Sequence, residues 1–193
     1  MQKQIKEQIL ESISVKKQIL DNCLEDIGTA AEILISAIKD NGKILWCGNG
    51  GSAGDAQHLA TELMGGMTSH DRKPISSIAL TTDTSFITAW SNDTDFESIF
   101  SRQIQGLGKE GDVLVAISTS GNSSNIIAAI KQAKYKGLKT ISFTGKTGGK
   151  LNGLSDITIY VPSENTQRIQ EGHIMIGQII CGLLEDDFLK LDE

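Results

Sequence analysis

The first residues whose types and spacing could do chemistry lie in WCGNGGSAGDAQHLATEL, residues 46–63. This segment leaves an apolar run, crosses a glycine-rich turn and then places His58 and Glu62 four residues apart. If the part after the turn is helical, these two side chains share one face. A histidine nitrogen and a carboxylate oxygen suit Zn²⁺ or a similar divalent ion. Two side chains do not make a metal site, and an exposed polar pair is the simpler interpretation.

The glycine turn itself has more than one interpretation. Gly48, Gly50 and Ala53 satisfy a relaxed dinucleotide-binding fingerprint, with a strand before them and a helix after them. That fingerprint expects an acidic residue about 20 residues further on, whereas the next strand end is at Asp83, well beyond that spacing. We therefore interpret the turn as a place where backbone approaches a ligand and a helix start offers free N–H groups, or as a tight turn without a ligand.

A second loop, ISTSGNSSN (117–125), follows a later apolar run and is rich in hydroxyl groups. Such a loop at a helix N-terminus suits a phosphate monoester, held by hydroxyl and backbone donors. No lysine follows as it does in a P-loop, which disfavours nucleoside triphosphates. Ordinary N-capping by serine explains one hydroxyl, but not the four of Ser118, Thr119, Ser120 and Ser123.

A third segment, RIQEGHIMIGQ (168–178), could complete a metal site. At helical spacing Gln170 and His173 line one stripe with Ile174 and Gly177, and Gln178 falls beside it. Amide oxygens of the two glutamines are candidate ligands. His173 itself is interpreted as a packed histidine.

The elements that must position these segments alternate between strand and helix after residue 42. Alternation of this kind predicts an α/β fold with a doubly wound parallel sheet. We expect the strand order 2-1-3-4-5, which makes the first and third strands neighbours and brings the glycine and serine loops to one crevice. The predicted strands are 43–47, 75–80, 112–118, 139–145 and 156–162, and the predicted helices between them are 52–67, 84–108, 123–137 and 147–154.

Long helices are predicted at both ends, at 1–40 and 165–189. The first is expected to break near Asp21 or Gly28, and the second to be capped by Asn165 or Thr166. Both carry more apolar surface than one sheet face covers, so pairing between subunits and packing on the parent sheet are both open. The whole chain, 1–193, is expected to be one domain, with residues 1–40 used in packing or oligomerisation.

The composition narrows the function classes. With 193 residues, 39% of them hydrophobic, and a net charge of −6, the chain suits one globular domain and argues against nucleic acid as its ligand. No segment approaches a membrane span. The three cysteines are widely spaced and form no C-x-x-C pair, so we expect reduced thiols and a cytoplasmic protein.

Taken together, the motifs CGNGGSAGDAQHLATEL (47–63), SND (91–93), GDVL (111–114), ISTSGNS (117–123) and RIQEGHI (168–174) resemble bacterial phosphoheptose isomerases, members of the sugar isomerase (SIS) domain superfamily. The resemblance runs from about residue 5 to residue 189. It implies a cytoplasmic homotetramer with zinc and with active sites at subunit contacts. It also implies conversion of sedoheptulose 7-phosphate to D-glycero-D-manno-heptose 7-phosphate through an enediol, for lipopolysaccharide or capsule heptose.

The resemblance also implies roles for residues that match its motifs. Glu62 would move the proton, and His58, Glu62 and Gln170 would be metal or substrate ligands. The phosphate would be held by Ser118, Thr119, Ser120 and Ser123. The sugar would be lined by Asn49, Gly50, Gly51, Ser52, Asn92 and Asp93.

This sequence departs from the family pattern at Gln178, where the family has a histidine that serves as metal ligand and second acid–base group. Glutamine offers a carbonyl oxygen but cannot exchange a proton near neutral pH. We therefore expect a slowed or inactive isomerase, with zinc held weakly or lost, unless His173 compensates. The alternatives are a non-catalytic sugar-phosphate-binding regulatory or adaptor protein on the same fold, and a phosphosugar isomerase for another ketose.

Overall fold

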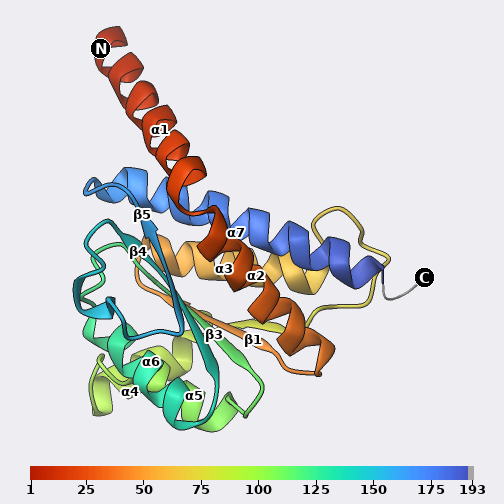
Figure 1. Ribbon diagram of the computed structural model, residues 1–193. Coiled ribbons are helices and arrows are strands. Elements are labelled where there is room, and N and C mark those ends of the chain that lie inside the picture. The colour runs from red at the N-terminus through yellow and green to blue at the C-terminus, as the bar shows by residue number, and fades with distance from the viewer. Residues whose placement is uncertain (191–193) are drawn as a thin grey trace.

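A computed structural model describes residues 1–190 of the chain, and its centre is a five-stranded parallel sheet. The strand order is β2-β1-β3-β4-β5, which confirms the predicted order and the α/β class (Figure 1). Val, Ile and Leu dominate β3, whose residues are all buried, as a strand covered on both faces requires. The strands are β1 (Ile44–Gly48), β2 (Ser77–Ala79), β3 (Val113–Ser118), β4 (Lys139–Gly145) and β5 (Ile157–Val161).

Helices cover both faces of this sheet, as Figure 1 shows. Successive residues of β1 divide between two hydrophobic clusters, Ile44 and Trp46 facing one way and Leu45 and Cys47 the other. The first cluster is completed by α2 (Leu24–Lys39), α3 (Gly51–Gly65), α7 (Thr166–Leu189) and the end of α1 (Gln2–Asn22). The second is completed mainly by α5 (Ile99–Leu107) and α6 (Ser124–Tyr135), with α4 (Thr84–Asp93) at its margin.

Two predicted helices were wrong. The segment 84–108 forms two helices, because α4 ends at Asp93 and Asp95 Oδ1 then accepts a hydrogen bond from Ser98 N at 2.6 Å, which closes a turn. The predicted helix 147–154 is only a short 3₁₀ turn, η1 (Gly149–Leu151). Gly148 and Gly149 have φ of 70° and 52°, a left-handed conformation that an α-helix cannot include.

The terminal helices follow the prediction closely. The break lies at Cys23, near Asp21, while Gly28 lies inside α2. Asn165 is the N-cap of α7, its side chain accepting a hydrogen bond from Gln167 N. Of α1, only Val15 and Ile19 are buried, and Figure 1 shows its first turns projecting from the body of the molecule. Residues 191–193 of the predicted domain lie outside the described residues.

The sheet positions the two loops of interest. β1 and β3 pair in parallel, with Gly48 opposite Ile117, so the segments that follow both strands leave the same edge of the sheet. Among the helices of residues 1–190, none is both long enough and apolar enough to cross a membrane.

Candidate active site

The glycine turn joins β1 to α3 by a sharp change of direction. Gly50, the residue before α3, has φ 55° and ψ −119°, a conformation that strongly favours glycine. A Cβ on Gly48 would overlap Ser52, so the turn is closely packed on itself. Ser52 is buried as a result, whereas Gly50 and Gly51 are exposed at the helix start. The turn therefore presents backbone groups more than the Ser52 hydroxyl.

A pair of asparagines ties the two loops together. Asn49 Nδ2 donates to Asn125 Oδ1 at 2.8 Å, and Asn125 Nδ2 donates back to Asn49 Oδ1 at 2.9 Å. Asn49 belongs to the glycine turn, and Asn125 lies in the first turn of α6, directly after the serine loop. The two loops thus meet at one edge of the sheet, as predicted. Asn125 was not among the predicted site residues.

The serine loop is a compact turn at the start of α6. Ser118 Oγ and Ser123 Oγ lie 3.2 Å apart, and Ser120 Oγ accepts a hydrogen bond from Asn122 N. Thr119 and Ser120 line a polar cavity of about 190 Å³. Its other lining residues come from the end of β4 and the start of α7, namely Gly145, Lys146, Thr147, Ser163, Glu164, Thr166 and Ile169. Thr119 and Ser120 therefore face this cavity, whereas Ser118 and Ser123 contact each other.

The histidine and carboxylate meet one of the predicted glutamines. His58 Nε2 lies 2.8 Å from Glu62 Oε1, and Gln178 Nε2 lies 3.3 Å from the same histidine nitrogen. His58 and Glu62 share one face of α3, and α7 brings Gln178 against that face. The His58 and Glu62 side chains keep 46% and 21% of their surface exposed, so this cluster is open to a ligand.

Gln170 lies at the other end of the same helix pair. Its amide packs so closely on Gly51 that a Cβ at that position would overlap it. Gln170 also donates a hydrogen bond to Asp55, whose carboxyl group is 8% exposed and whose Oδ2 has no partner within the described chain. Burial raises the pKa of Asp55 to about 6, although His58 and the Gln170 hydrogen bond oppose the rise.

Sequence reasoning missed Asp55. A signal was available, because Asp55, His58 and Glu62 are spaced three and four residues apart and so follow one side of α3. What no spacing announced is the contact of Asp55 with Gln170 from the far end of the chain.

The donor set fits a divalent ion only if amides take part. Within residues 1–190, no three His, Cys, Asp or Glu side chains are grouped so that they could hold a metal ion. His58 and Glu62 supply one nitrogen and one carboxylate, and Gln178 adjoins them directly. Gln170 is linked to α3 by its hydrogen bond to Asp55, whose other carboxylate oxygen, Oδ2, is buried without a hydrogen-bond partner in the described chain. The imidazole and the carboxylate are ligand types that zinc prefers, and the amide oxygens of the two glutamines would have to complete the set.

His173 takes no part in this cluster. It is fully buried, its Nε2 is 3.2 Å from the carbonyl oxygen of Thr144, and its ring packs near Phe143. Burial lowers the pKa of His173 to about 4, against the Thr144 hydrogen bond, which favours the protonated ring. The interpretation as a packed histidine is confirmed, and nothing in its surroundings in the described chain supports compensation for Gln178 by His173.

Within residues 1–190, Asn92 and Asp93 make no hydrogen bond with the other predicted sugar-binding residues, so the structure of one chain does not join them to the glycine turn. They occupy the last turn of α4, both exposed, and Asn92 Nδ2 donates to Asp93 Oδ1. Neither lines the cavity of about 160 Å³ beside the glycine turn, whose walls are Gly48, Asn49, Gly50, Ala53, Thr81, Ile87, Phe96, Ile99 and Phe100. Within one chain, the cavity wall beside the glycine turn is largely apolar.

The sequence and the fold of this chain are similar to those of known proteins over nearly the whole chain. The SIS domain family matches residues 9–145. A phosphoheptose isomerase of Sulfurimonas denitrificans is 46% identical over 189 residues, which span 97% of this chain and 96% of that protein. The chain belongs to the phosphoheptose isomerase family.

Two further members of the family support this assignment. A phosphoheptose isomerase of Nitratiruptor is 53% identical over 146 residues, 76% of this chain and 78% of that protein. The structure of phosphoheptose isomerase GmhA from Neisseria gonorrhoeae superposes with a TM-score of 0.91 at 41% identity, covering 96% of this chain and 98% of that one. In this member of the family, the glycine turn and the serine loop lie at the carboxyl edge of the sheet. His58, Glu62 and Gln178 lie where α3 and α7 meet.

Proposed function

We propose that the protein converts sedoheptulose 7-phosphate to D-glycero-D-manno-heptose 7-phosphate through an enediol. One observation carries the proposal beyond family membership. The hydroxyl-rich loop and the helix bearing His58 and Glu62 start from neighbouring strands, and Asn49 and Asn125 join their origins. The non-catalytic alternative is not favoured, because the carboxylate and imidazole of a reactive site are present and in contact. The product would enter lipopolysaccharide or capsule heptose synthesis in the cytoplasm.

The substrate phosphate is assigned to the serine loop. Ser118, Thr119, Ser120 and Ser123 surround the N-terminus of α6, where free N–H groups and the helix dipole favour an anion. Hydroxyl donors that bind the phosphate do not discriminate between sugars of different chain length. Discrimination among ketose phosphates therefore falls to residues nearer the reacting carbons, including those of the glycine turn.

Proton transfer is assigned to Glu62. In the direction from ketose to aldose, a base removes a proton from C1 while the C2 carbonyl oxygen gains one, which makes the enediol. The proton returns to C2 as the C1 hydroxyl loses its own and becomes the carbonyl. Glu62 is half-buried and held by His58, so its carboxylate is oriented for this transfer between adjacent carbons.

A zinc ion held by His58, Glu62, Gln170 and Gln178 would stabilise the oxyanion that develops on the enediol oxygens. Gln178 contacts His58 in the position of the family's histidine, and it can contribute an oxygen but no proton. Weaker zinc binding and slower turnover follow from that replacement.

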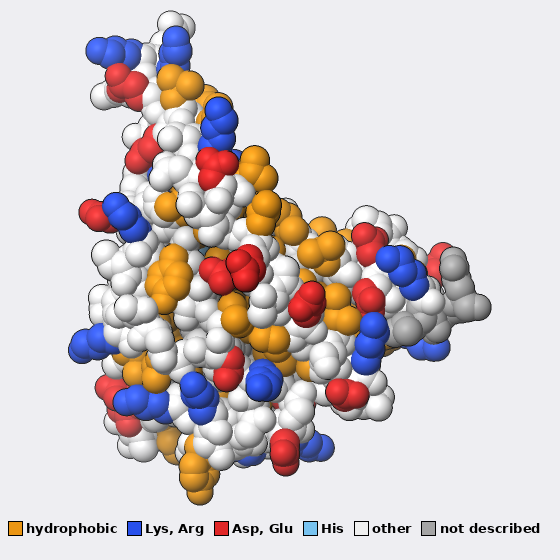
Figure 2. Space-filling view, viewed as in Figure 1, with side chains coloured by type: hydrophobic (Ala, Val, Ile, Leu, Met, Phe, Trp, Pro, Cys, Tyr) orange, Lys and Arg blue, Asp and Glu red, His pale blue; other side chains and the backbone are white. Residues whose placement is uncertain are grey.

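A homotetramer with active sites at subunit contacts completes the proposal. Helix α1 exposes a row of large apolar side chains that the chain itself does not cover, Ile5, Ile9, Leu10, Ile13 and Leu20 (Figure 2). A second copy is the simplest cover for such a row. Asn92 and Asp93 would line the sugar only in the assembled protein.

The test is an isotope-exchange assay on sedoheptulose 7-phosphate in deuterated water. The wild-type protein should form the aldose phosphate and incorporate deuterium at C1 or C2. Glu62→Gln should abolish both, because the amide cannot accept the proton. Glu25→Gln, on the exposed first turn of α2, is the matched control and should leave both unchanged. Persisting exchange in Glu62→Gln would remove that residue from the base role.

A further inference from the structure

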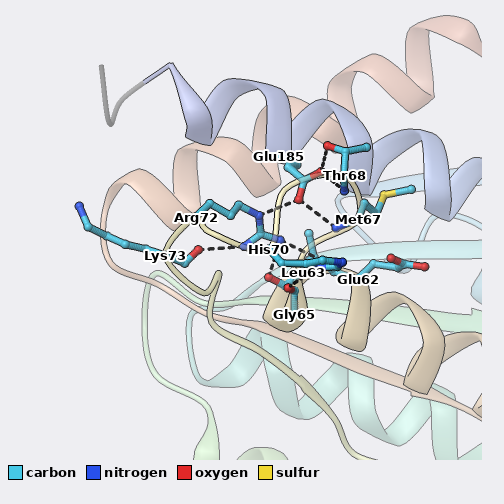
Figure 3. A network of polar contacts seen from close by, with 9 residues as sticks. All are labelled: Glu62, Leu63, Gly65, Met67, Thr68, His70, Arg72, Lys73 and Glu185. Atoms are coloured by element: carbon cyan, nitrogen blue, oxygen red, sulfur yellow. Dashed lines mark hydrogen bonds and ion pairs between the residues drawn. The ribbon is translucent and has the colours of Figure 1, made fainter.

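A buried ion pair lies beyond the catalytic face of α3 and α7, between Arg72 and Glu185 (Figure 3). Arg72 Nε donates to Glu185 Oε1 at 2.7 Å, and both side chains are nearly inaccessible, at 1% and 2% exposed. Glu185 also accepts hydrogen bonds from Met67 N, Thr68 N and the Thr68 hydroxyl. The pair therefore has the partners that a buried charge requires.

The arginine reaches the backbone of the proposed base. Arg72 Nη2 donates to the carbonyl oxygens of Glu62, at 3.0 Å, and Leu63, at 2.8 Å. These carbonyls belong to the last turn of α3, where a cation is also favoured by the helix dipole. A single planar guanidinium thus joins the end of α3 to a carboxylate on α7.

The position of Glu185 on α7 couples this ion pair to the position of Gln178 on the same helix. Glu185 lies about two helical turns beyond Gln178 and on the same side of α7. An axial shift of α7 against α3 would therefore displace Gln178 from His58 by the same amount.

The hydrogen bond of Gln170 to Asp55 constrains the first turns of α7 against α3, whereas the contacts in the middle of the two helices are weaker constraints on that shift. Gly177 sits so close to Leu59 that a Cβ would overlap the leucine side chain, and Cys181 Sγ lies 3.8 Å from Leu59 O. The contact of Gly177 with Leu59 is apolar and non-directional, and the Cys181 thiol is only a weak hydrogen-bond donor to Leu59 O. The guanidinium–carboxylate geometry is directional and fixes both partners. A buried ion pair adds little net stability compared with apolar packing. Its directional geometry is therefore the property that can fix the register of α3 against α7.

We propose that Arg72 and Glu185 are a positioning pair that sets the register of α3 against α7, and so the spacing of Glu62 and His58 from Gln178. The proposal rests on the proposed function of that cluster. It assigns neither residue to the chemistry itself.

The test compares Arg72→Met with a matched control, Lys43→Met. Lys43 pairs with the buried Asp112 at the opposite edge of the sheet. In both variants the remaining carboxylate keeps two backbone N–H donors, Met67 and Thr68 for Glu185 and Lys43 and Lys109 for Asp112. Each variant therefore removes the cation from a buried carboxylate that keeps backbone donors, although Lys43 is more exposed than Arg72, at 18% against 1%.

Three quantities are measured on each full-length protein: the thermal midpoint, zinc affinity by competition with a chelator, and kcat and KM for sedoheptulose 7-phosphate. Both variants should lower the midpoint. Only Arg72→Met should weaken zinc affinity, by about 10- to 100-fold, and lower kcat by about tenfold or more. Its KM should stay within about threefold of wild type, because the phosphate loop is untouched.

Equal zinc affinity and kcat in the two variants would overturn the positioning role while leaving the isomerase assignment intact. A wild-type protein without isomerase activity would instead overturn the proposed function, and the positioning role with it. If Arg72→Met does not fold, Arg72→Lys takes its place, because an ammonium keeps the charge but cannot reach Glu185 and both carbonyls at once. Arg72→Lys should show the same loss of zinc affinity, and wild-type affinity there would refute the proposal.

Discussion

At the scale of single residues, the reactive edge depends on which atoms can carry a proton. Glu62 can, His58 is engaged with it at 2.8 Å, and Gln178 cannot. The second histidine of α7, His173, is buried against Thr144 and unavailable. In the proposed mechanism one acid–base group therefore remains, and general acid–base groups contribute roughly 10²–10⁴ in rate.

Restoring a histidine at this position should restore rate. We expect Gln178→His to raise kcat by at least about tenfold and to increase the bound zinc, because imidazole supplies both a proton carrier and a stronger ligand. Steady-state kinetics and elemental analysis of the two proteins, side by side, measure both effects. Gln132→His, on α6, controls for the mere addition of a histidine. An unchanged rate and metal content would mean that Gln178 is not the defect.

At the scale of elements, α3 and α7 form the site together. Small residues let them approach, at Gly51 against Gln170 and at Gly177 against Leu59. Polar groups then hold them, with Asp55 bonded to Gln170 at one end and Glu185 bonded to Arg72 at the other. The two helices meet along their length, so a change at either end is expected to shift the proposed ligands His58, Glu62 and Gln178.

Acid should reveal the Glu185 end of this contact. Burial favours the protonated carboxyl, but hydrogen bonds from Thr68, Arg72 and Met67 outweigh it and lower the pKa of Glu185 from 4.5 to about 2. A lowered folded-state pKa stabilises the fold above pH 4.5, and this contribution is lost as the pH falls toward 2. Over that range the free energy of unfolding should fall by about 3 kcal/mol from this group.

Chemical denaturation of the wild type and of Glu185→Gln, at several pH values from 5 down to 2, measures this contribution. The gap between the two free energies of unfolding should narrow as the pH falls, because the variant has no carboxylate to protonate. Asp156, whose pKa is also lowered, affects both proteins equally. Two parallel curves would show that Glu185 does not carry the effect.

At the scale of the whole molecule, the exposed apolar surface of α1 is not covered by any part of the same chain that the structure describes. It projects from the body, with Ile9 and Ile13 more than half exposed (Figure 2). Arg168 ties its middle to α7, donating to Gln8 O at 2.6 Å, so the projection is held in place from its base. An exposed apolar row of this kind suits assembly, since burying an isoleucine side chain contributes about 1.5–3 kcal/mol.

Charge on this arm should break the assembly. We expect Ile9→Asp to lower the molar mass in solution below that of the wild type, measured by light scattering after size-exclusion chromatography, and to lower isomerase activity with it. Gln18→Asp, on the opposite and exposed side of the same helix, places the same charge away from this row and should change neither. An Ile9→Asp protein of unchanged mass would assign the apolar row to another partner.

Much of this arrangement could be predicted from local patterns. Apolar runs and helical periodicity predicted the five strands and the terminal helices, and the strand order followed from the rules for parallel sheets. The break at 94–98 was missed because Asp95 closes its turn with Ser98 through a side chain, which hydrophobic spacing does not register.

The sequence by itself determined the fold class, the family, the hydroxyl loop and the pairing of His58 with Glu62, because each rests on neighbours in the chain or on one helical period. Only the tertiary structure decided that Asp55 bonds Gln170, that Asn49 pairs with Asn125 and that Arg72 reaches Glu185. These contacts join residues far apart in the chain. Their partners are chosen by how α3, α6 and α7 pack on the sheet, and no local spacing records that choice.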